Sequence, residues 1–296
     1  MPSMEPPSVF RDGICQGRVA LVAGGGSGIG FEIARQLGLH GARVVLMGRR
    51  KEVLDAAVGA LKDEGILAAS ASGDVRRQED AVAAVKLAAG TFGHLDILVN
   101  AAAGNFLVTP EQLSPNGFRT VMDIDTVGAF TMCHSAFAEL SKCERSTIIN
   151  ISANLHLPAT WYQVHASAAK AAIDSLTCSL ALEWGQFGIR VAGIAPGPIA
   201  DTPGLLKLSG GADPGALERM MGKAVPVGRM GTKREIAMMA LFLVSEAGGY
   251  ISGTTVLVDG GQYLYKLPPM PRETIASLSR SVEGKSRSVA IPKSKL

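Results

Sequence analysis

Short apolar runs alternate with longer stretches of helical periodicity along most of the 296 residues, and no other feature constrains the fold as strongly. Runs that are apolar throughout are typical of strands in a parallel sheet that helices cover on both faces. The alternation therefore predicts a single α/β domain with a doubly wound parallel sheet of about seven strands. The expected strands cover residues 18–23, 43–47, 66–71, 95–100, 147–152, 190–195 and 255–258. The expected helices follow the first strand up to His40 and cover residues 51–64, 78–91, 115–140, 164–187 and 233–245.

The composition is that of a globular protein, with 47% hydrophobic and 19% charged residues and a net charge of +3. This charge is too small to indicate a nucleic-acid partner. The basic excess comes from the end of the sequence, because the residues from Lys266 onward include seven Lys or Arg and two acidic residues. No apolar run approaches the ~20 residues that a membrane-spanning helix needs, so no membrane span is expected.

The sequence divides into three expected segments. Residues 1–13 form an N-terminal appendage, residues 14–265 the main domain, and residues 266–296 a basic tail. The tail ends in Ser294-Lys295-Leu296, a tripeptide that the peroxisomal import receptor reads at a C-terminus. We therefore expect a peroxisomal protein that has the import receptor as one partner.

The four cysteines show no paired spacing. They are Cys15, Cys133, Cys143 and Cys178. We expect reduced thiols in an intracellular protein, with no disulfide framework and no metal site.

A glycine-rich run lies between the first expected strand and the first expected helix. Glycines let the backbone approach a pyrophosphate closely, and the helix N-terminus offers unpaired N–H groups and the positive end of its dipole. Because a strand precedes the run and a helix follows it, the run predicts the phosphate-binding turn of a Rossmann-type dinucleotide site. The residues expected to bind the cofactor here are Gly24, Gly26, Ser27, Gly28, Ile29 and Gly30.

The end of the second expected strand indicates which dinucleotide binds. It reads Met47-Gly48-Arg49-Arg50. A site that prefers NAD places an acidic residue here for the ribose hydroxyls, whereas an arginine suits the 2′-phosphate of NADP. We therefore expect NADPH/NADP+, with Arg49 as the phosphate ligand and Arg50 as a solvated residue.

From about Gly17 to Gly261 the sequence resembles the short-chain dehydrogenase/reductase family. The matching pieces are the glycine run, Asp74-Val75, Asn100–Gly104, Asn150–Ser152, Lys170, Pro196–Ile199 and Val258–Gly261. The resemblance implies that Asp74 and Val75 flank the adenine and that Lys170 binds the nicotinamide ribose. It places Asn100 in the cofactor site as well. The loop beside the nicotinamide carboxamide would include Pro196, Gly197, Ile199 and Thr202.

Three positions depart from the family pattern. The tyrosine four residues before Lys170 is replaced by Ala166, the family serine by Ala153, and the asparagine of the central helix by Asp125. A tyrosine beside a lysine protonates the alkoxide that forms when a carbonyl is reduced, and an alanine cannot. The departures therefore disfavour a ketone reductase or an alcohol dehydrogenase.

One branch of the family, the peroxisomal 2,4-dienoyl-CoA reductases, also lacks this tyrosine. The chain resembles that branch at residues 103–106, 121–126, 163–166 and 195–199. The resemblance implies that hydride enters at the δ carbon, charge moves to the thioester oxygen, and the proton is needed at the α carbon. The product would be a 3-enoyl-CoA in the β-oxidation of unsaturated fatty acids. Reduction of another enoyl- or acyl-CoA and an inactive dinucleotide-binding scaffold remain alternatives.

Three residues are expected to carry the chemistry. Asp125 is the expected acid, acting directly or through a bound water, and burial or a second carboxylate would raise its pKa. Its alternative is a structural helix residue. The resemblance implies Asp259 as the second carboxylate, although Asp-Gly-Gly is also a natural turn. Lys170 would orient the ribose and add positive potential near the enolate.

The resemblance also implies contacts with the CoA thioester. The residues expected to bind the substrate are Arg49, Arg76, Phe106, Ser114, Pro115, Asn116 and Lys207. A stretch at about 203–223 with flanking glycines is expected to form a substrate lid. Tyr162 is interpreted as an aromatic residue of the pocket or its loop, and His165 as structural. The stretches 115–140 and 164–187 carry many small apolar residues. Such helices pack into dimers and tetramers in the family that the chain resembles, so the resemblance implies a homo-oligomer, a dimer or a tetramer.

Overall fold

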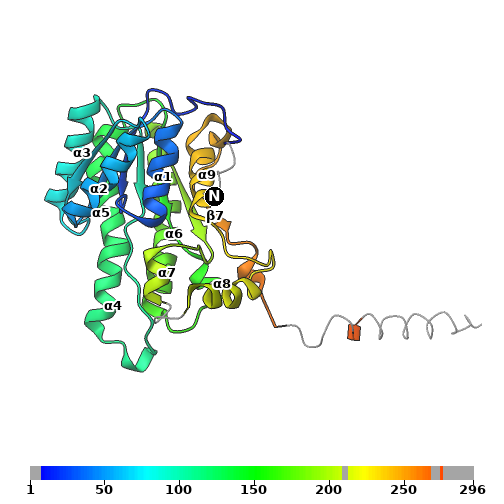
Figure 1. Cartoon of the computed structure of the whole chain (residues 1–296). Helices are drawn as coiled ribbons and strands as arrows, with labels where there is room; N and C mark the ends of the chain where they lie inside the picture. Colours follow the sequence, from blue (N-terminus) through cyan, green and yellow to red (C-terminus); the bar gives the residue numbers. More distant parts are fainter. Residues whose placement is uncertain (1–7, 209–212, 268–273, 276–296) are drawn as a thin grey trace, which may run out of the picture. The chain divides into compact units, whose positions relative to one another are not determined.

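The computed structural model describes residues 8–208, 213–267 and 274–275. The chain divides into two compact units, Met1–Tyr263 and Leu264–Leu296. Within the described residues, the first unit contains one seven-stranded sheet of order β3-β2-β1-β4-β5-β6-β7, and all its strand pairs are parallel. Helices cover both faces of this sheet (Figure 1). The predicted doubly wound fold is therefore confirmed.

The strands and the helices predicted from the sequence lie close to their expected positions, whereas two helices within 203–223, the stretch expected to form a lid, were not predicted as helices. The strands are β1 (Val19–Ala23), β2 (Arg43–Gly48), β3 (Ala68–Ser72), β4 (Ile97–Asn100), β5 (Ser146–Ile151), β6 (Ile189–Pro196) and β7 (Thr255–Val258). The helices are α1 (Gly28–Leu39), α2 (Lys51–Asp63), α3 (Gln78–Phe92), α4 (Pro115–Met122), α5 (Gly128–Leu140), α6 (Val164–Trp184), α7 (Pro203–Leu208), α8 (Pro214–Lys223) and α9 (Lys233–Val244). Among the described residues, no helix is long and apolar enough to cross a membrane.

The core has two layers because successive strand residues point to opposite faces of the sheet. In β1, Ala20 and Val22 face one layer, where α1 packs against α9. Val19 and Leu21 face the other layer, where α3 packs against α5. The central strands β1, β4 and β5 are buried on both faces, which explains why they are largely apolar.

The strand order reverses direction between β1 and β4, which are neighbours in the sheet. In open α/β sheets, ligands bind at such a switch point, beyond the carboxyl ends of the strands. The loop after β1 carries the glycine run, and β4 ends at Asn100. The topology therefore places the expected cofactor residues at this edge.

The expected single helix at 115–140 is interrupted. Residues Asp123–Val127 form a π-helical turn between α4 and α5. A π turn inserts one extra residue and is frequent at functional sites. A Cβ on Gly128, directly after the turn, would lie 2.6 Å from Cγ2 of Val75. Helical periodicity in the sequence did not reveal this turn, because it involves tertiary contacts.

The cysteines within the described residues are free thiols. Burial raises the pKa of Cys15 to about 11 and that of Cys133 to about 12. These two thiols therefore stay protonated at physiological pH and act as small apolar core residues.

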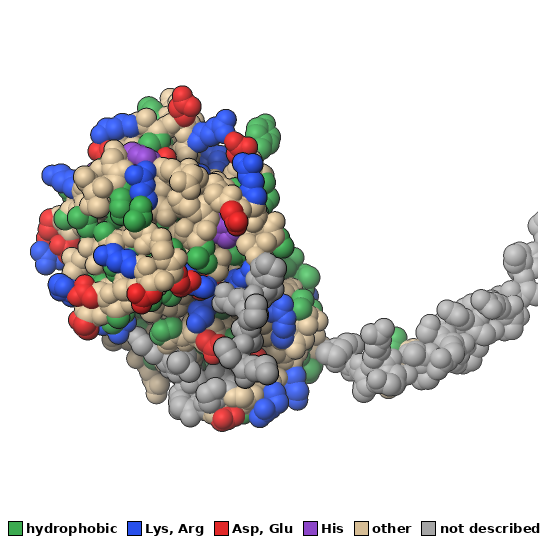
Figure 2. Space-filling model, turned by 45° about the horizontal axis from the view of Figure 1, so that its top comes forward, with side chains coloured by type: hydrophobic (Ala, Val, Ile, Leu, Met, Phe, Trp, Pro, Cys, Tyr) green, Lys and Arg blue, Asp and Glu red, His purple; other side chains and the backbone are tan. Residues whose placement is uncertain are grey.

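Acidic and basic side chains are interspersed over the face of the protein shown in Figure 2. This pattern agrees with the small net charge of +3.

Glu235 is predicted to stabilise the fold in a pH-dependent way. Its carboxylate accepts a hydrogen bond from the N–H of Thr232 at 2.8 Å, which closes a capping box on α9, and pairs with Arg229 at 2.6 Å. Arg229 holds the pKa of Glu235 at about 2. At pH 7, Glu235→Gln should lower the free energy of unfolding by about 1 kcal/mol, measured by urea titration.

The difference between the wild type and this variant should shrink as the pH falls. The folded pKa lies below the unfolded value of ~4.3, so the stabilisation is present above that value and lost as the pH falls toward 2. Glu246→Gln is the matched control, because the Glu246–Arg145 pair is exposed and should contribute less than ~0.5 kcal/mol. A difference that stays constant from pH 7 to pH 3 would contradict this assignment.

Candidate active site

Two glycines let the loop after β1 fold tightly at the switch point. Gly24 has φ +80°, and a Cβ there would lie 2.6 Å from the backbone N of Ala102. A Cβ on Gly30 would overlap the carbonyl oxygen of Gly24. Neither position accepts a side chain, so the loop keeps the close backbone approach that a dinucleotide pyrophosphate requires.

The N-terminus of α1 faces the same edge of the sheet. Ser27 is the N-cap residue, and its side chain makes no capping hydrogen bond. The first turn of α1 begins with Gly28 and Ile29, and its N–H groups can therefore bind an anion. We call the loop shaped by Gly24 and Gly30 the glycine cradle. The glycine cradle and the N-terminus of α1 together fit the pyrophosphate of a dinucleotide.

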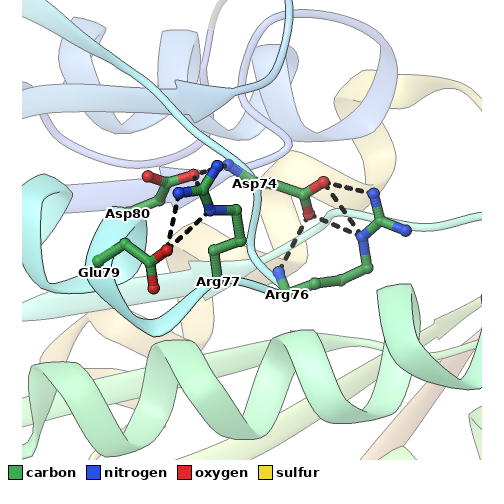
Figure 3. Close-up of polar contacts among 5 residues, drawn as sticks. All are labelled: Asp74, Arg76, Arg77, Glu79 and Asp80. Atoms are coloured by element: carbon green, nitrogen blue, oxygen red, sulfur yellow. Dashed lines mark hydrogen bonds and ion pairs between the residues drawn. The ribbon is translucent and has the colours of Figure 1, made fainter.

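An ion pair lies on the segment after β3, at the expected adenine end. The Asp74 carboxylate accepts three hydrogen bonds from the Arg76 guanidinium, from Nε to Oδ1 at 3.0 Å, from Nε to Oδ2 at 3.1 Å and from Nη2 to Oδ2 at 2.5 Å (Figure 3). This pairing holds the pKa of Asp74 below its usual value, and the nearby Arg49 adds to the effect. Arg49 follows β2 directly and is exposed.

Asp125 and Lys170 form a buried ion pair at the centre of the site. Nζ of Lys170 lies 3.0 Å from Oδ2 of Asp125, and both side chains are almost inaccessible to solvent. The other carboxylate oxygen accepts the N–H of Gly104 at 2.7 Å. Nζ also donates to the carbonyl oxygen of Ile151 at 3.0 Å. The pair thereby joins the π turn, α6 and the ends of β4 and β5.

Ala166 lies one helical turn before Lys170 and carries no polar group. It is buried in a small apolar cluster with Val121 and Ala169. No hydroxyl replaces the family tyrosine at this place in α6. The nearest substitute in sequence, Tyr162, is half exposed on the preceding loop, with φ +61°.

A cavity of about 10 Å³ lies beside the ion pair. This is about the volume that one water molecule needs. Asp125, Lys170 and Asn100 line it together with apolar residues, among them Val75. The Asn100 side chain donates to Oδ1 of Asn150 at 2.9 Å, while its own Oδ1 has no partner among the described residues. The polar lining therefore suits a water bound next to the carboxylate.

Asp259 lies on a different loop, directly after β7. Its carboxylate accepts hydrogen bonds from Asn154 Nδ2 at 2.8 Å and from the N–H groups of Gly261 and Tyr263 at 2.9 Å each. Among the described residues, no hydrogen bond or ion pair joins it to Asp125 or Lys170. These bonds match the alternative that Asp-Gly-Gly forms a turn.

The segment after β6 has the position expected for the nicotinamide loop. The N–H of Gly197 donates to the carbonyl of Val258, and Ile199 pairs with Gly231 in an isolated bridge. Thr202 accepts the N–H of Leu205 and so caps α7. Pro198, Ile199 and Asp259 also border a second cavity of about 210 Å³.

The other expected substrate residues lie on three further segments, the loop after β4, α4 and α7. Phe106 is part of the loop after β4, and its ring stacks on His165 at 4.4 Å. Ser114 caps α4 by accepting the N–H of Gly117, and Pro115 and Asn116 form the first turn. Lys207 belongs to α7, but its side chain lies outside the described residues, as do Ser294, Lys295 and Leu296.

His165 contributes more to the site than its sequence interpretation suggested. The ring is fully buried, and neither nitrogen has a hydrogen-bond partner among the described residues. Burial lowers the pKa of this imidazole, although the Phe106 backbone and Asp125 oppose the shift. The sequence carried no signal for this contact, which depends on how the loop after β4 folds over α6.

The glycine cradle yields a test. Gly30→Ala should weaken nicotinamide dinucleotide binding at least about tenfold, because a Cβ there displaces Gly24 and the loop. Binding is measured by quenching of NADPH fluorescence. Gly59→Ala is the matched control, because no atom lies within 4 Å of its Cβ position in α2. It should leave binding unchanged and slightly raise the melting temperature. Equal binding by both variants would contradict the assignment of the loop.

Comparison with known proteins agrees with this geometry. A family model described as enoyl-(acyl carrier protein) reductase matches residues 23–262. A protein of Arabidopsis thaliana named peroxisomal 2,4-dienoyl-CoA reductase [(3E)-enoyl-CoA-producing] is 53% identical over 98% of this chain and 99% of its own length. A protein of the same name from Rattus norvegicus is 41% identical over 86% of this chain and 87% of its own.

Bacterial proteins are also similar. A Bacillus subtilis protein named probable 2,4-dienoyl-CoA reductase [(2E)-enoyl-CoA-producing] is 39% identical over 85% of this chain and 98% of its own. The crystal structure of a short chain dehydrogenase from Bacillus anthracis superposes with a TM-score of 0.76 at 35% identity, covering 86% of this chain and all of that one.

Proposed function

The chain belongs to the short-chain dehydrogenase/reductase family, and we propose that it reduces 2,4-dienoyl-CoA to 3-enoyl-CoA in peroxisomal β-oxidation of unsaturated fatty acids. It is similar over nearly its whole length to a plant protein that carries this name. One observation carries the proposal. A buried Asp125–Lys170 pair occupies the reaction centre, while Ala166 stands where a carbonyl reductase of this family has its proton donor.

The chemistry explains why no tyrosine is needed. A nicotinamide held by the glycine loop after β1 would supply the hydride for the δ carbon of the conjugated thioester. The electron pair moves through the diene toward the thioester oxygen, and a proton then adds to the α carbon to give the 3-enoyl product. No alkoxide forms, so a donor at position 166 would have nothing to protonate. The ammonium of Lys170 adds positive potential where negative charge develops.

We propose that Asp125 delivers the proton through a water in the adjacent cavity. The water protonates the α carbon, and the proton that the Asp125–Lys170 pair holds on the Lys170 ammonium replaces the one that the water gives up. The cavity of about 10 Å³ borders Asp125 and Lys170 and has the size for one water. Gly104 and Lys170 fix the carboxylate from two sides, so its orientation is set before substrate binds. Asp259 is proposed to hold the Asn154 loop in place instead of sharing the proton.

The family and the glycine cradle establish a nicotinamide dinucleotide cofactor, and we propose that it is NADPH. Gly48 leaves no acidic side chain for the ribose hydroxyls at the end of β2. The exposed Arg49 follows directly, and its guanidinium has no ion pair among the described residues. A free arginine at this place suits a 2′-phosphate.

The remaining partners are proposals from the sequence. Arg76, Phe106, the first turn of α4 and Lys207 are proposed to contact the CoA thioester. Arg76 is already paired with Asp74, so it would offer the substrate only part of its hydrogen-bonding capacity. Ser294-Lys295-Leu296 is proposed to bind the import receptor, and a homo-oligomer remains a prediction.

The activity is tested by following NADPH oxidation with three substrates. We expect turnover of a 2,4-dienoyl-CoA, none of a 3-ketoacyl-CoA, and a kcat/KM at least about tenfold lower when NADH replaces NADPH. The product must be identified, since the Bacillus subtilis relative is named for a (2E)-enoyl product. Absence of turnover with every dienoyl-CoA would overturn the proposed function. Equal rates with both dinucleotides would overturn the cofactor preference alone.

Replacing the proposed acid separates chemistry from folding. Asp125→Asn should lower kcat about 100-fold or more while KM changes little, because positioned proton transfer is lost and the shape is kept. Asp123→Asn lies on the same π turn, outside the ion pair, and should keep the wild-type rate. NADPH binding by both variants shows that the site still folds. A wild-type kcat in Asp125→Asn would show that Asp125 does not deliver the proton.

A further inference from the structure

Two loops beside the Asp125–Lys170 pair expose an unusual group of large apolar side chains. We propose that these side chains, with Trp161 at their centre, bind the hydrocarbon tail of the acyl-CoA substrate. We call the group the apolar rim, and it consists of Phe106, Leu107, Leu157, Trp161, Tyr162 and Val164. The assignment of the tail rests on the proposed function, because it needs an acyl-CoA in the site.

Direct contacts fasten the two loops together. The N–H of Val108 donates to the carbonyl oxygen of Tyr162 at 3.0 Å. Asn105 donates through Nδ2 to Oε1 of Gln163 at 2.6 Å, and Phe106 stacks on His165. These contacts hold residues 105–108 against residues 162–165, and the two segments together carry Phe106, Leu107, Tyr162 and Val164 of the apolar rim.

The rim is joined to the reaction centre on both sides. Gly104, two residues before Phe106, donates its N–H to Asp125. On the other loop, Val164 begins the helix that carries Lys170. A thioester whose reacting carbons lie at the ion pair would therefore have the rim directly alongside. The cavity at the pair holds only about 10 Å³, so a long tail has to leave along the surface.

The solvent exposure of these large apolar side chains indicates that the apolar rim binds a ligand. Trp161 is 81% exposed, although tryptophan gains more than most residues from burial. Its ring lies 5.9 Å from that of Tyr162, so the two aromatics are neighbours on the surface. Contiguous apolar patches of this kind mark binding sites more often than single exposed residues do.

The charge pattern identifies the ligand as a hydrocarbon. Residues 101–109 and 153–164 contain no Asp, Glu, Lys or Arg, whereas charged side chains are interspersed on the face shown in Figure 2. The histidine of these loops, His156, is directed at Asp174, with Nε2 at 3.0 Å from Oδ2. The polyanionic CoA group would find no cation in these loops. An uncharged alkyl chain has no charged group to desolvate there, and it gains free energy from apolar contact.

The base of the second loop is fixed while its tip carries the aromatics. Asn154 bonds to Asp259 and Gln262, which ties the loop to the end of β7. Tyr162 has φ +61°, a conformation that a bulky residue adopts only when its surroundings enforce it. The loop therefore presents Trp161 in a defined position next to the site.

Chain-length dependence tests the apolar rim. The kcat/KM of the wild type is compared for 2,4-hexadienoyl-CoA and 2,4-decadienoyl-CoA, which differ by four methylenes. Trp161→Ser should reduce the preference for the longer substrate about tenfold, and Trp161→Phe should retain most of it. Leu182→Ser is the matched control, because Leu182 is 85% exposed near the other end of α6. It should keep the wild-type preference.

The outcomes separate the rim from the proposed function. An equal loss of kcat/KM with both substrates in Trp161→Ser, or an unchanged preference for the longer one, would contradict the proposal that the apolar rim binds the hydrocarbon tail. A change of oligomeric state in Trp161→Ser, seen by light scattering, would assign Trp161 to contact with a second copy and also overturn it. If the wild type reduces neither diene, the proposed function fails, and the rim is still tested by binding of saturated decanoyl-CoA and hexanoyl-CoA in calorimetry. The rim then requires that the wild type prefer decanoyl-CoA and that Trp161→Ser lose this preference.

Discussion

The site depends on one buried ion pair, between Asp125 and Lys170. Burying two charges is favourable only if each finds partners for its remaining bonding capacity. The N–H of Gly104 satisfies the carboxylate, and the carbonyl of Ile151 satisfies the ammonium. These four groups come from the π turn, α6 and the ends of β4 and β5, so the pair fixes the geometry of the whole switch point. Removing either partner would leave an uncompensated charge in the core.

The same pair gives the loss of the family tyrosine a chemical meaning. Ala166 packs into an apolar cluster and leaves the carboxylate and its neighbouring cavity as the polar features beside Lys170. A proton held in the cavity beside Asp125 can reach the α carbon of the substrate, which is the atom that conjugate reduction protonates. In the proposed reaction the proton therefore goes to a carbon of the substrate instead of to an alkoxide. The loop that contains Gly24 and Gly30 still allows a close backbone approach to a dinucleotide.

Sequence patterns predicted the fold well because they report on local structure. Apolar strands and helical periodicity predicted the strands and most of the helices to within a few residues. Features that depend on contacts between distant segments were not predicted. The π turn at Asp123–Val127 and the stack of Phe106 on His165 are of this kind. For Asp259, motif resemblance and turn chemistry gave different answers, and its hydrogen bonds favour the turn.

Reduction in deuterium oxide tests the central claim most directly, because it shows which carbon receives the solvent proton. The wild type is given a 2,4-dienoyl-CoA and unlabelled NADPH, and the product is examined by proton and deuterium NMR. The account predicts a 3-enoyl-CoA with one deuterium at the α carbon and only hydrogen from the cofactor at the δ carbon. A 2-enoyl product with deuterium at the γ carbon would contradict it, because the proton would then be delivered at a different place from the one that Asp125 and Lys170 define.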